Sequence, residues 1–495
     1  MSDKRNFIAS AFAVAALTLV GPSLSGCVIT NPATGQQDLT PFMSPQEEKR
    51  IGAEEHPKML ARFGGVYDDI EIGAYVAGIG GRLVKSSELP NLEFRFTVLN
   101  SPSVNAFALP GGYVYVTRGL LALANSEAEL AGVLAHEIGH VTARHAAQRY
   151  NRAIATSLGT AILGAVVQSP GVNQLAQIGG ELFLKGFSRE QEFQADTLGV
   201  RYMSRVGYDP EAQAAFLRTL SSHSDLERQL VAGQDGRDSG QDFFATHPRT
   251  EDRVLKAIAA AQVSGVRAGA PLRREQYLRK MTGLLYGDDP EQGLVRGRSF
   301  VHPGLGFAFE VPPGYRLFNT ERAVIAKGPE DARIRFDAAK KPTAADLTSY
   351  LAQTWARGLT LTDVERITVN GMDAATGRAS IRSAGKPADL RLVAVRFSKE
   401  EIYRIMMVTP LRIEPRVRRE LQRTTYSFRR LTQREAAEYR PFRLGVIAVQ
   451  PGDTIEALAR RMPFDDYQVA RFQTLNGLSA NARVLPGQQV KIVAD

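Results

Sequence analysis

Apolar residues recur at two spacings along the first 170 residues, and the spacing separates helices from strands. Residues 44–82 follow helical spacing, whereas residues 92–99 alternate between polar and apolar side chains, which predicts a strand. Residues 105–109 and 113–117 are typical of two further strands joined by a Pro-Gly-Gly turn. The apolar run 153–167 is shorter than the roughly 20 residues that cross a bilayer, so we expect a buried helix or a hydrophobic lid.

Strand patterns dominate again beyond residue 299. Alternating segments, a hairpin signal at Asn370-Gly371 and helical segments at 345–358 and about 411–424 predict a small α+β domain at residues 299–430. No catalytic constellation is evident in it. The stretch 268–298 before it is charged and marked by Gly and Pro, which is typical of a domain linker.

A helix with two histidines one turn apart follows the first strands. Ser126 and Glu129 form an S-x-x-E capping box, so the helix is predicted to begin near Glu127. His136 and His140 then lie about 40° apart on one face of that helix. Two imidazoles arranged in this way can bind a single Zn²⁺.

Glu137 lies between the two histidines, rotated around the helix, where it reaches a metal-bound water better than it reaches the metal. Two incidental histidines are the alternative, but with 7 His in 495 residues chance gives this pattern on the order of 0.005 times per chain. His145 lies about half a turn from His136 on a continuous helix, so we expect a structural role for it away from the metal.

A second predicted helix, residues 188–206, carries two acidic residues on one face. Two histidines and a glutamate make a zinc site with its fourth position open to water, and Glu192 is the candidate third ligand. Asp196, one turn further on, is then expected to accept a hydrogen bond from a ligand histidine. Glu190 is a rival ligand, but it points about 160° away from Glu192. A solvated acidic face is the alternative.

Composition indicates an ordinary globular chain. Its 495 residues suggest about three domains, and 44% hydrophobic with 23% charged residues excludes a disordered chain. The formal charge of +9 is spread along the sequence. Since no motif combines basic and aromatic residues, we expect no nucleic-acid partner.

The N-terminus has the layout of a bacterial lipoprotein signal. Two basic residues precede an apolar run at 7–20, and Leu24-Ser25-Gly26-Cys27 resembles the bacterial lipobox. The resemblance implies a signal peptide at residues 1–26 and a lipid on Cys27, followed by a polar, turn-rich tether at residues 27–43. An ordinary secretory signal is the alternative. Cys27 is the sole cysteine, so no intramolecular disulfide can form.

Three separated motifs carry a family resemblance over residues 44–265. The H-E-x-x-H motif at 136–140, Asn-Ala-Phe-Ala-Leu-Pro-Gly-Gly at 105–112 and the S-R-x-x-E-x-x-A-D segment at 188–196 resemble the metallopeptidase family of the CAAX prenyl proteases and HtpX-type proteases. The resemblance implies a mainly α, zincin-type peptidase domain with a small β-sheet, residues 44–267. It also implies one Zn²⁺ per chain. By this resemblance the zinc ligands are His136, His140 and Glu192, and the general base is Glu137.

This chain departs from the prenyl and HtpX-type proteases because it has no segment that spans a membrane. It instead resembles the periplasmic lipoprotein branch, which handles outer-membrane proteins, and this speaks against prenylated substrates. The strand ahead of the metal helix has a possible use in binding. We expect its edge, formed by Asn105, Ala106, Phe107 and Ala108, to pair with an extended substrate, with simple sheet packing as the alternative.

A late His-Pro motif followed by an arginine matches these proteases as well. His247 and Arg253 are therefore candidate catalytic residues that help to bind the oxyanion. His247 follows a Gly/Asp-rich stretch, and a second role is open to it, as a removable plug in the vacant zinc position. A structural His-Pro turn is the alternative.

Residues 441–495 resemble a LysM module with a βααβ fold. Pro451-Gly452-Asp453-Thr454, Leu475-Asn476-Gly477-Leu478 and Pro486-Gly487-Gln488 carry the resemblance, and a helix is predicted at 467–475. That family binds N-acetylglucosamine polymers such as peptidoglycan, so the resemblance implies peptidoglycan as a partner. A docking fold without sugar binding is the alternative.

Together these features predict a lipid-anchored zinc metalloendopeptidase at the periplasmic face of the outer membrane. Its expected substrates are envelope proteins, in particular misfolded or misassembled outer-membrane proteins. Lipid and LysM module would hold it between membrane and cell wall. Two alternatives stay open, an assembly chaperone with restrained protease activity and a hydrolase of peptidoglycan peptides.

Overall fold

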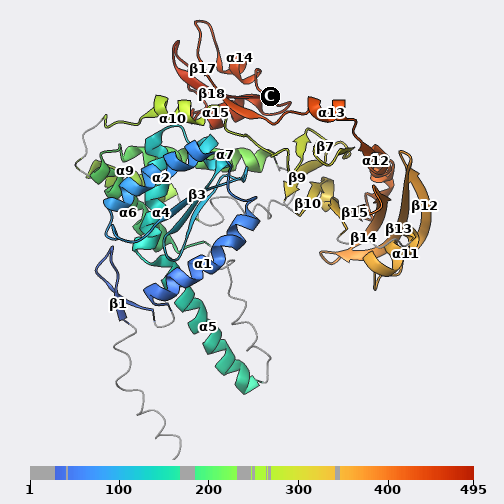
Figure 1. The fold of residues 1–495 in the computed structure, drawn as a ribbon, viewed down its shortest axis with the longest axis horizontal. Helices are drawn as coiled ribbons and strands as arrows, with labels where there is room; N and C mark the ends of the chain where they lie inside the picture. The colour runs from blue at the N-terminus through green and yellow to red at the C-terminus, as the bar shows by residue number, and fades with distance from the viewer. Residues whose placement is uncertain are drawn as a thin grey trace, which may run out of the picture.

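The computed structural model describes residues 28–40, 43–167, 184, 186–230, 247, 251–263, 265, 269–320, 322–339 and 346–495. The predicted signal peptide and the predicted lipid attachment site, Cys27, lie outside these residues. Within them the chain forms an N-terminal, a middle and a C-terminal domain (Figure 1). None of the helices in the described ranges combines the length and the apolarity that crossing a bilayer requires.

The N-terminal domain is mainly helical around a three-stranded sheet of order β3-β5-β4. β3 (Arg95–Leu99) runs parallel to β5 (Tyr113–Thr117), and β4 (Ala106–Leu109) pairs antiparallel with β5 at the edge. A hairpin of β1 (Val28–Thr30) and β2 (Gln37–Leu39) precedes them. The helices of this domain are α1 (Pro45–Arg62), α2 (Ile70–Lys85), α3 (Arg118–Leu123), α4 (Glu127–Thr142), α5 (His145–Val167), α6 (Arg189–Val206), α7 (Glu211–Leu230), α9 (Glu251–Gln262) and α10 (Arg274–Met281).

The α4 helix lies at the centre of this domain and is buried on nearly all sides. Glycines allow α6 to approach it closely. A Cβ added to Gly139 of α4 would lie 3.1 Å from the carbonyl oxygen of Ala195, and one added to Gly199 of α6 would lie 3.3 Å from the backbone nitrogen of His136. The close approach brings the predicted metal-binding faces of the two helices together.

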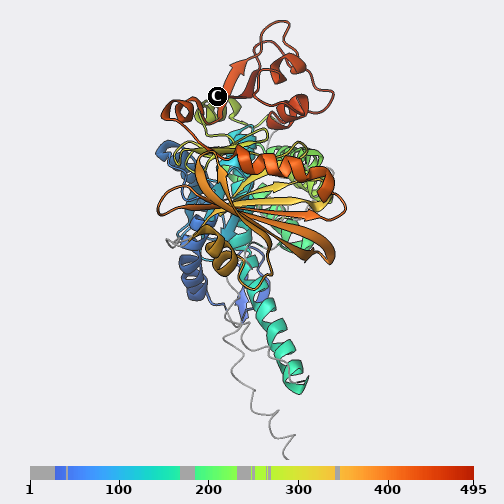
Figure 2. The same cartoon turned by 90° about the vertical axis from the view of Figure 1, so that its right-hand side faces the viewer.

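The long helical segment that starts at Ser126 is interrupted after α4. The break falls at Arg144, whose φ of 55° lies in the left-handed region. α5 then begins at His145 and leaves the body of the domain, as both views show (Figures 1 and 2). The predicted apolar run 153–167 is therefore helical, and its helix projects from the part of the domain that the structure describes.

The middle domain contains two sheets and a helix that covers them (Figure 2). The larger sheet has the order β12-β13-β14-β15-β11-β10-β9, and the smaller one the order β16-β8-β7-β6. Asn370 and Gly371 have φ values of 49° and 78° at the turn between β12 and β13, as the predicted hairpin requires. The strands are β6 (Leu294–Arg296), β7 (Ser299–His302), β8 (Phe307–Glu310), β9 (Arg316–Thr320), β10 (Ala323–Lys327), β11 (Arg333–Ala338), β12 (Thr362–Val369), β13 (Met372–Ser383), β14 (Lys386–Arg396), β15 (Ile402–Pro410) and β16 (Arg429–Arg430).

Helices accompany the middle-domain strands where the sequence predicted them, with shifted ends. α11 (Leu347–Ser349) continues into a π-helical turn at Tyr350–Trp355, and α12 spans Glu414–Ser427. The predicted α+β domain thus forms. Its apolar clusters contain only residues of the middle domain, so it has a core of its own.

The segment 268–298 differs from the linker that its composition predicts. Its helix α10 buries Tyr277, Leu278 and Met281 completely in the core of the N-terminal domain, and Leu294–Arg296 is a strand of the middle domain. The segment still connects the two domains along the chain. The helical spacing of residues 277, 278 and 281 is what places them on one buried face.

The C-terminal domain has the predicted βααβ order and lies against the N-terminal domain (Figure 1). β17 (Arg443–Ala448) and β18 (Gln489–Ala494) pair antiparallel, with α14 (Ile455–Ala459) and α15 (Gln468–Leu475) between them. The short α13 (Gln433–Glu438) leads into the domain. Phe472, Leu475 and Val490 belong to the same apolar cluster as residues of α3 and α4, so the two domains share one core.

Candidate metal centre

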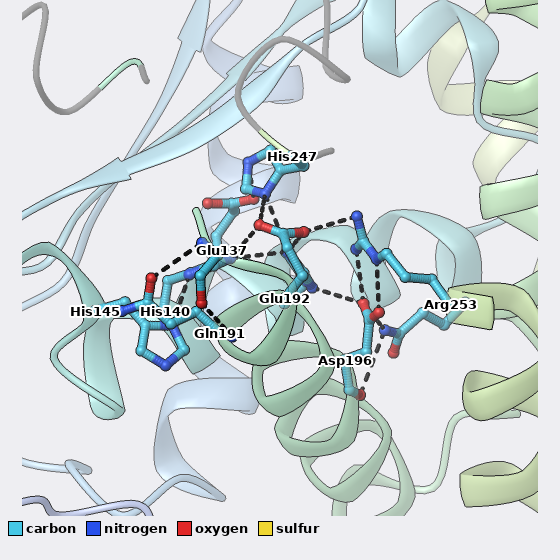
Figure 3. A network of polar contacts seen from close by, with 11 residues as sticks. Glu137, His140, His145, Gln191, Glu192, Asp196, His247 and Arg253 are labelled. Carbon is cyan, nitrogen blue, oxygen red and sulfur yellow. Dashed lines mark hydrogen bonds and ion pairs between the residues drawn. The ribbon is translucent and has the colours of Figure 1, made fainter. Parts of the chain in front are cut away.

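Four donor atoms converge where α4, α6 and the chain ahead of α9 meet (Figure 3). Nε2 of His136 lies 3.0 Å from Nε2 of His140 and 3.2 Å from Nδ1 of His247. Oε1 of Glu192 lies 3.1 Å from the same His247 nitrogen and 3.6 Å from Nε2 of His140. The four residues form a single buried cluster whose ligand atoms lie within 4.8 Å of one another.

These spacings fit one tetrahedral ion. Donors about 2.0–2.1 Å from a central metal are about 3.3 Å apart along each edge of a tetrahedron. Five of the six donor pairs lie 3.0 to 3.6 Å apart, with Oε2 of Glu192 nearest His136 and Oε1 nearest His140 and His247, and all ligand atoms lie within 4.8 Å of one another. The structure therefore brings the three predicted ligands together and adds His247 as a fourth donor.

The protonation states also suit metal binding. Burial, together with the nearby His136 and His145, holds the pKa of His140 well below its ordinary value, which keeps the imidazole neutral. Burial alone would raise the pKa of Glu192, but the charges of His247 and Arg253 outweigh it and lower that pKa. A neutral imidazole and an ionised carboxylate are the forms that coordinate a metal.

Asp196 lies behind the first histidine, as predicted. One of its carboxylate oxygens is 2.9 Å from Nδ1 of His136, the ring nitrogen that faces away from the cluster. Gln213 donates to the same oxygen over 3.0 Å. Burial opposes ionisation, but Arg253 and His136 hold the pKa of Asp196 well below its usual value. An anionic acceptor here fixes the tautomer and the orientation of the His136 ring.

Arg253, the other candidate for binding the oxyanion, contacts two carboxylates of the site. Its Nε and Nη2 donate to the two oxygens of Asp196 over 2.8 and 2.9 Å, and Nη1 lies 2.7 Å from Oε2 of Glu192. The guanidinium thus binds the carboxylates of both Asp196 and Glu192 (Figure 3). In this position Arg253 supports a ligand and the partner of a ligand, and its role at the oxyanion stays a prediction.

Glu137 is fully buried beside the cluster. Its Oε1 lies 3.3 Å from Nε2 of His247, and within the described residues neither carboxylate oxygen has a hydrogen-bond partner. Burial raises the pKa of Glu137, although His247 and His136 oppose the shift. A buried carboxylate with free lone pairs next to a metal-binding cluster is suited to accept a proton.

His247 lies between the third predicted ligand and the predicted base. Its two ring nitrogens contact Glu192 and Glu137, the third ligand and the predicted base. The side chain is fully buried, and the carboxylates of Glu192 and Glu137 raise its pKa against the effect of burial. Of the roles that the sequence left open for His247, this geometry resembles the plug.

His145 is a functional contact that sequence reasoning missed. Its Nδ1 lies 2.8 Å from Nδ1 of His140, and its Nε2 lies 2.6 Å from Oε1 of Gln194. The residue stays off the metal cluster, as expected, yet it orients a ligand. The half-turn estimate assumed a continuous helix, whereas the break at Arg144 turns His145 back toward His140. Burial lowers its pKa to about 4, so the ring is neutral at pH 7.

The remaining sequence candidates lie nearby. β4, which contains Ala106, Phe107 and Ala108 and follows Asn105, is an edge strand of the three-stranded sheet. A small hollow joins its end to the metal cluster, lined among others by Ala108, His140 and Phe187, whose ring stacks on His140. Substrate pairing along this edge stays a prediction. His56, by contrast, bonds to the hydroxyl of Tyr115 and is structural.

Two regions of the chain match known family models. Residues 73–261 match the model of peptidase family M48, and residues 447–493 match the LysM domain. The chain therefore carries an M48 metallopeptidase domain followed by a C-terminal LysM domain, which confirms the family resemblance and both domain types.

The chain is also similar to individual proteases of known name. The chain is 31% identical over 261 residues to the "Beta-barrel assembly-enhancing protease" of Yersinia pestis, covering 49% of this chain and 51% of that protein. It is 27% identical over 263 residues to the protein of the same name in Escherichia coli K12, covering 51% and 52%. The "Mitochondrial metalloendopeptidase OMA1" of Schizosaccharomyces pombe is 31% identical over 215 residues, covering 42% and 59%. The chain thus spans about half the length of the two bacterial relatives.

Proposed function

We propose that this protein is a zinc metalloendopeptidase of the bacterial cell envelope. The observation that carries the proposal is the convergence of His136, His140 and Glu192 on one point beside the buried carboxylate of Glu137. The names of the relatives, a protease and a metalloendopeptidase, support the reaction class.

In the proposed reaction, zinc lowers the pKa of water and polarises the scissile carbonyl when it is bound. His136 and His140 hold the metal through Nε2, and Asp196 and His145 fix their rings. Glu137 accepts the proton of the attacking water and later passes it to the leaving amine. Its raised pKa favours the first half of that transfer, the uptake of the proton.

His247 restrains this centre in the resting state. Its Nδ1 belongs to the donor cluster, and its Nε2 faces Glu137, so substrate enters only after the side chain has moved. This restraint is the observation that favours the alternative of an assembly chaperone with limited protease activity. A chaperone function would persist while the metal centre stays closed.

The proposed substrates are envelope proteins, chiefly misfolded or misassembled outer-membrane proteins. The name "Beta-barrel assembly-enhancing protease" of the bacterial relatives supports this class. We place the protein at the periplasmic face of the outer membrane, attached through a lipid on Cys27, and assign Asn105 to Ala108 to substrate binding. The LysM domain supports peptidoglycan as a further partner.

Glu137→Gln tests the proposal. The variant should retain one zinc per chain by elemental analysis and lose cleavage of an unfolded reporter protein by about 10²–10⁴-fold. Asp209→Asn, at a half-buried position before α7 where asparagine can still accept from the backbone nitrogen of Glu211, is the matched control and should retain activity. If the wild-type protein binds no stoichiometric zinc, the proposal that it is a zinc metalloendopeptidase is refuted.

Cells that carry Glu137→Gln in place of the wild type separate the proposed functions. If uncleaved outer-membrane proteins accumulate, the result supports the protease. If outer-membrane proteins assemble normally although their cleavage products are missing, the result supports the chaperone. Changed muropeptides with unchanged proteins would support hydrolysis of peptidoglycan peptides.

A further inference from the structure

A lysine of the C-terminal domain lies buried against the start of the metal-binding helix. Lys491 of β18 is fully buried, and its Nζ donates to the carbonyl oxygens of Ala122, Leu123 and Ala124 over 2.7, 3.0 and 2.8 Å. Burial lowers the pKa of Lys491 and Glu129 opposes this shift, while the three carbonyl acceptors match the three hydrogens of an ammonium. The three carbonyls lie at the end of α3, where the helix dipole attracts a cation, just before Ser126, the N-cap of α4.

The base of this side chain is fixed within its own domain. Asn476 accepts a hydrogen bond from the backbone nitrogen of Lys491 over 2.7 Å and donates to its carbonyl oxygen over 2.9 Å. It also donates to the carbonyl oxygen of Phe472 in α15. Asn476 thus joins β18 to α15 at Lys491, the residue whose ammonium group reaches the N-terminal domain.

The turn between α3 and α4 is held from two further directions. Arg274 of α10 donates to the carbonyl oxygens of Asn125 and, at 3.3 Å, of Gln489, so it connects the turn to β18. Glu129 accepts from the backbone nitrogen of Asn125 over 2.7 Å. A Cβ on Gly477 would lie 3.2 Å from the amide nitrogen of the Asn125 side chain, so this glycine permits close contact between the domains.

Apolar packing surrounds these polar contacts. α15 contacts both α3 and α7, and its Phe472 and Leu475 share an apolar cluster with Leu120 and Leu121 of α3. A water-excluded surrounding strengthens each charge-assisted bond and makes its loss costly.

We propose that the C-terminal domain is a fixed part of the catalytic unit and that Lys491 is a positioning residue for the metal-binding helix. The inference rests on the proposed peptidase function. α4 is a rigid rod from Ser126 to His136, about 15 Å at 1.5 Å per residue. A displacement of its first turn therefore moves the His136 and Glu137 side chains relative to Glu192, which belongs to another helix.

The test uses the full-length protein with Lys491→Met, which keeps most of the side-chain volume and removes all three donors. Arg460→Met, an exposed cation at the end of α14, is the matched control. Because a misplacement of about 1 Å can lower the rate about 10²-fold, we expect kcat per zinc-loaded molecule to fall about 10- to 100-fold in Lys491→Met with KM little changed. Arg460→Met should match the wild type.

Amide hydrogen exchange gives a second readout that does not depend on catalysis. Residues 124–130 should exchange at least ten times faster in Lys491→Met than in the wild type, whereas exchange in the middle domain stays unchanged. If Lys491→Met does not fold, Arg274→Met is used in its place. It removes one connection and should shift both readouts in the same direction by less.

The outcomes separate the two proposals. A lower melting temperature with unchanged kcat per zinc-loaded molecule and unchanged exchange at residues 124–130 would make Lys491 merely structural and overturn the inference. A wild type without zinc or peptidase activity would refute the proposed function, and faster exchange in Lys491→Met would then still show that the domain holds the helix.

Discussion

At the metal cluster, each of the two histidine ligands of α4 is paired with a second residue that orients its ring. His136 is held by Asp196 and His140 by His145, each through the ring nitrogen that faces away from the cluster. Arg253 then neutralises the charge that Asp196 and Glu192 bring into the interior. The ligands are consequently oriented before any metal arrives, which lowers the conformational cost of binding it.

Replacement of His145 tests this orientation. His145→Phe keeps the ring volume but removes the contact to His140, and the zinc dissociation constant should rise about 10- to 100-fold. Competition with a chromophoric chelator measures it. His223→Phe, on α7 and outside the cluster, serves as control, and an unchanged affinity in His145→Phe would show that His140 is held by other means.

At this scale the sequence predicts ligands better than supporting contacts. H-E-x-x-H and the Glu192–Asp196 spacing depend on local helix geometry, which the sequence encodes directly. The contact of His145 depends on a helix break, and that of Arg253 depends on a helix distant in sequence. Residue spacing within one helix predicts neither contact. Asp196 was predictable because it shares a face with its ligand neighbour Glu192.

At the scale of elements, the distance between α4 and α6 decides whether the cluster forms. Gly139 and Gly199 add no side chain of their own between the helices. Gly139→Val should therefore destabilise the fold by about 1–3 kcal/mol and weaken zinc binding, because the added methyl groups push α6 away. Urea denaturation measures the first effect and metal titration the second.

Gly73→Ala is the control for that substitution. Gly73 lies within α2, and a Cβ there meets nothing within 4 Å. Alanine should stabilise the helix by about 0.5–1 kcal/mol. Equal destabilisation by both changes would mean that close helix packing is not the cause.

The first turn of α4 also carries a buried carboxylate with a pH-dependent effect. Glu127 accepts from Tyr75, Tyr208 and Arg273, and although burial opposes ionisation these partners lower its pKa. Because the folded-state pKa is depressed, the stabilisation is present above the ordinary pKa of glutamate, near 4.5, and is lost as the pH falls through the folded value. Glu127→Gln should lose about 2 kcal/mol at pH 7 and little at pH 3. Urea midpoints at both pH values check this, and equal losses would contradict it.

At the scale of the whole molecule, we expect the three domains to unfold as two cooperative units. The N- and C-terminal domains share a core, whereas the middle domain has its own. Composition suggested three domains joined by a linker, and local patterns predicted each domain type. The pairing of first and last domains was not predictable, because Lys491 and Ala122 are 369 residues apart and no spacing rule connects them.

Calorimetry should show two unfolding transitions. Zinc at 100 times its dissociation constant should stabilise the unit that contains the N- and C-terminal domains by about 2.7 kcal/mol and leave the middle-domain transition in place. A chelator reverses the shift. Three separate transitions, or a zinc-dependent middle domain, would contradict the shared core.

The contact of Lys491 with the end of α3 also has a consequence for the order in which the parts of the site are synthesised. Along the chain the histidine pair comes early, whereas the cation that holds the start of its helix comes some 370 residues after the end of α3. A nascent chain therefore carries the metal ligands before the last strand, and on the proposed role of Lys491 it becomes a competent peptidase only when β18 has been added.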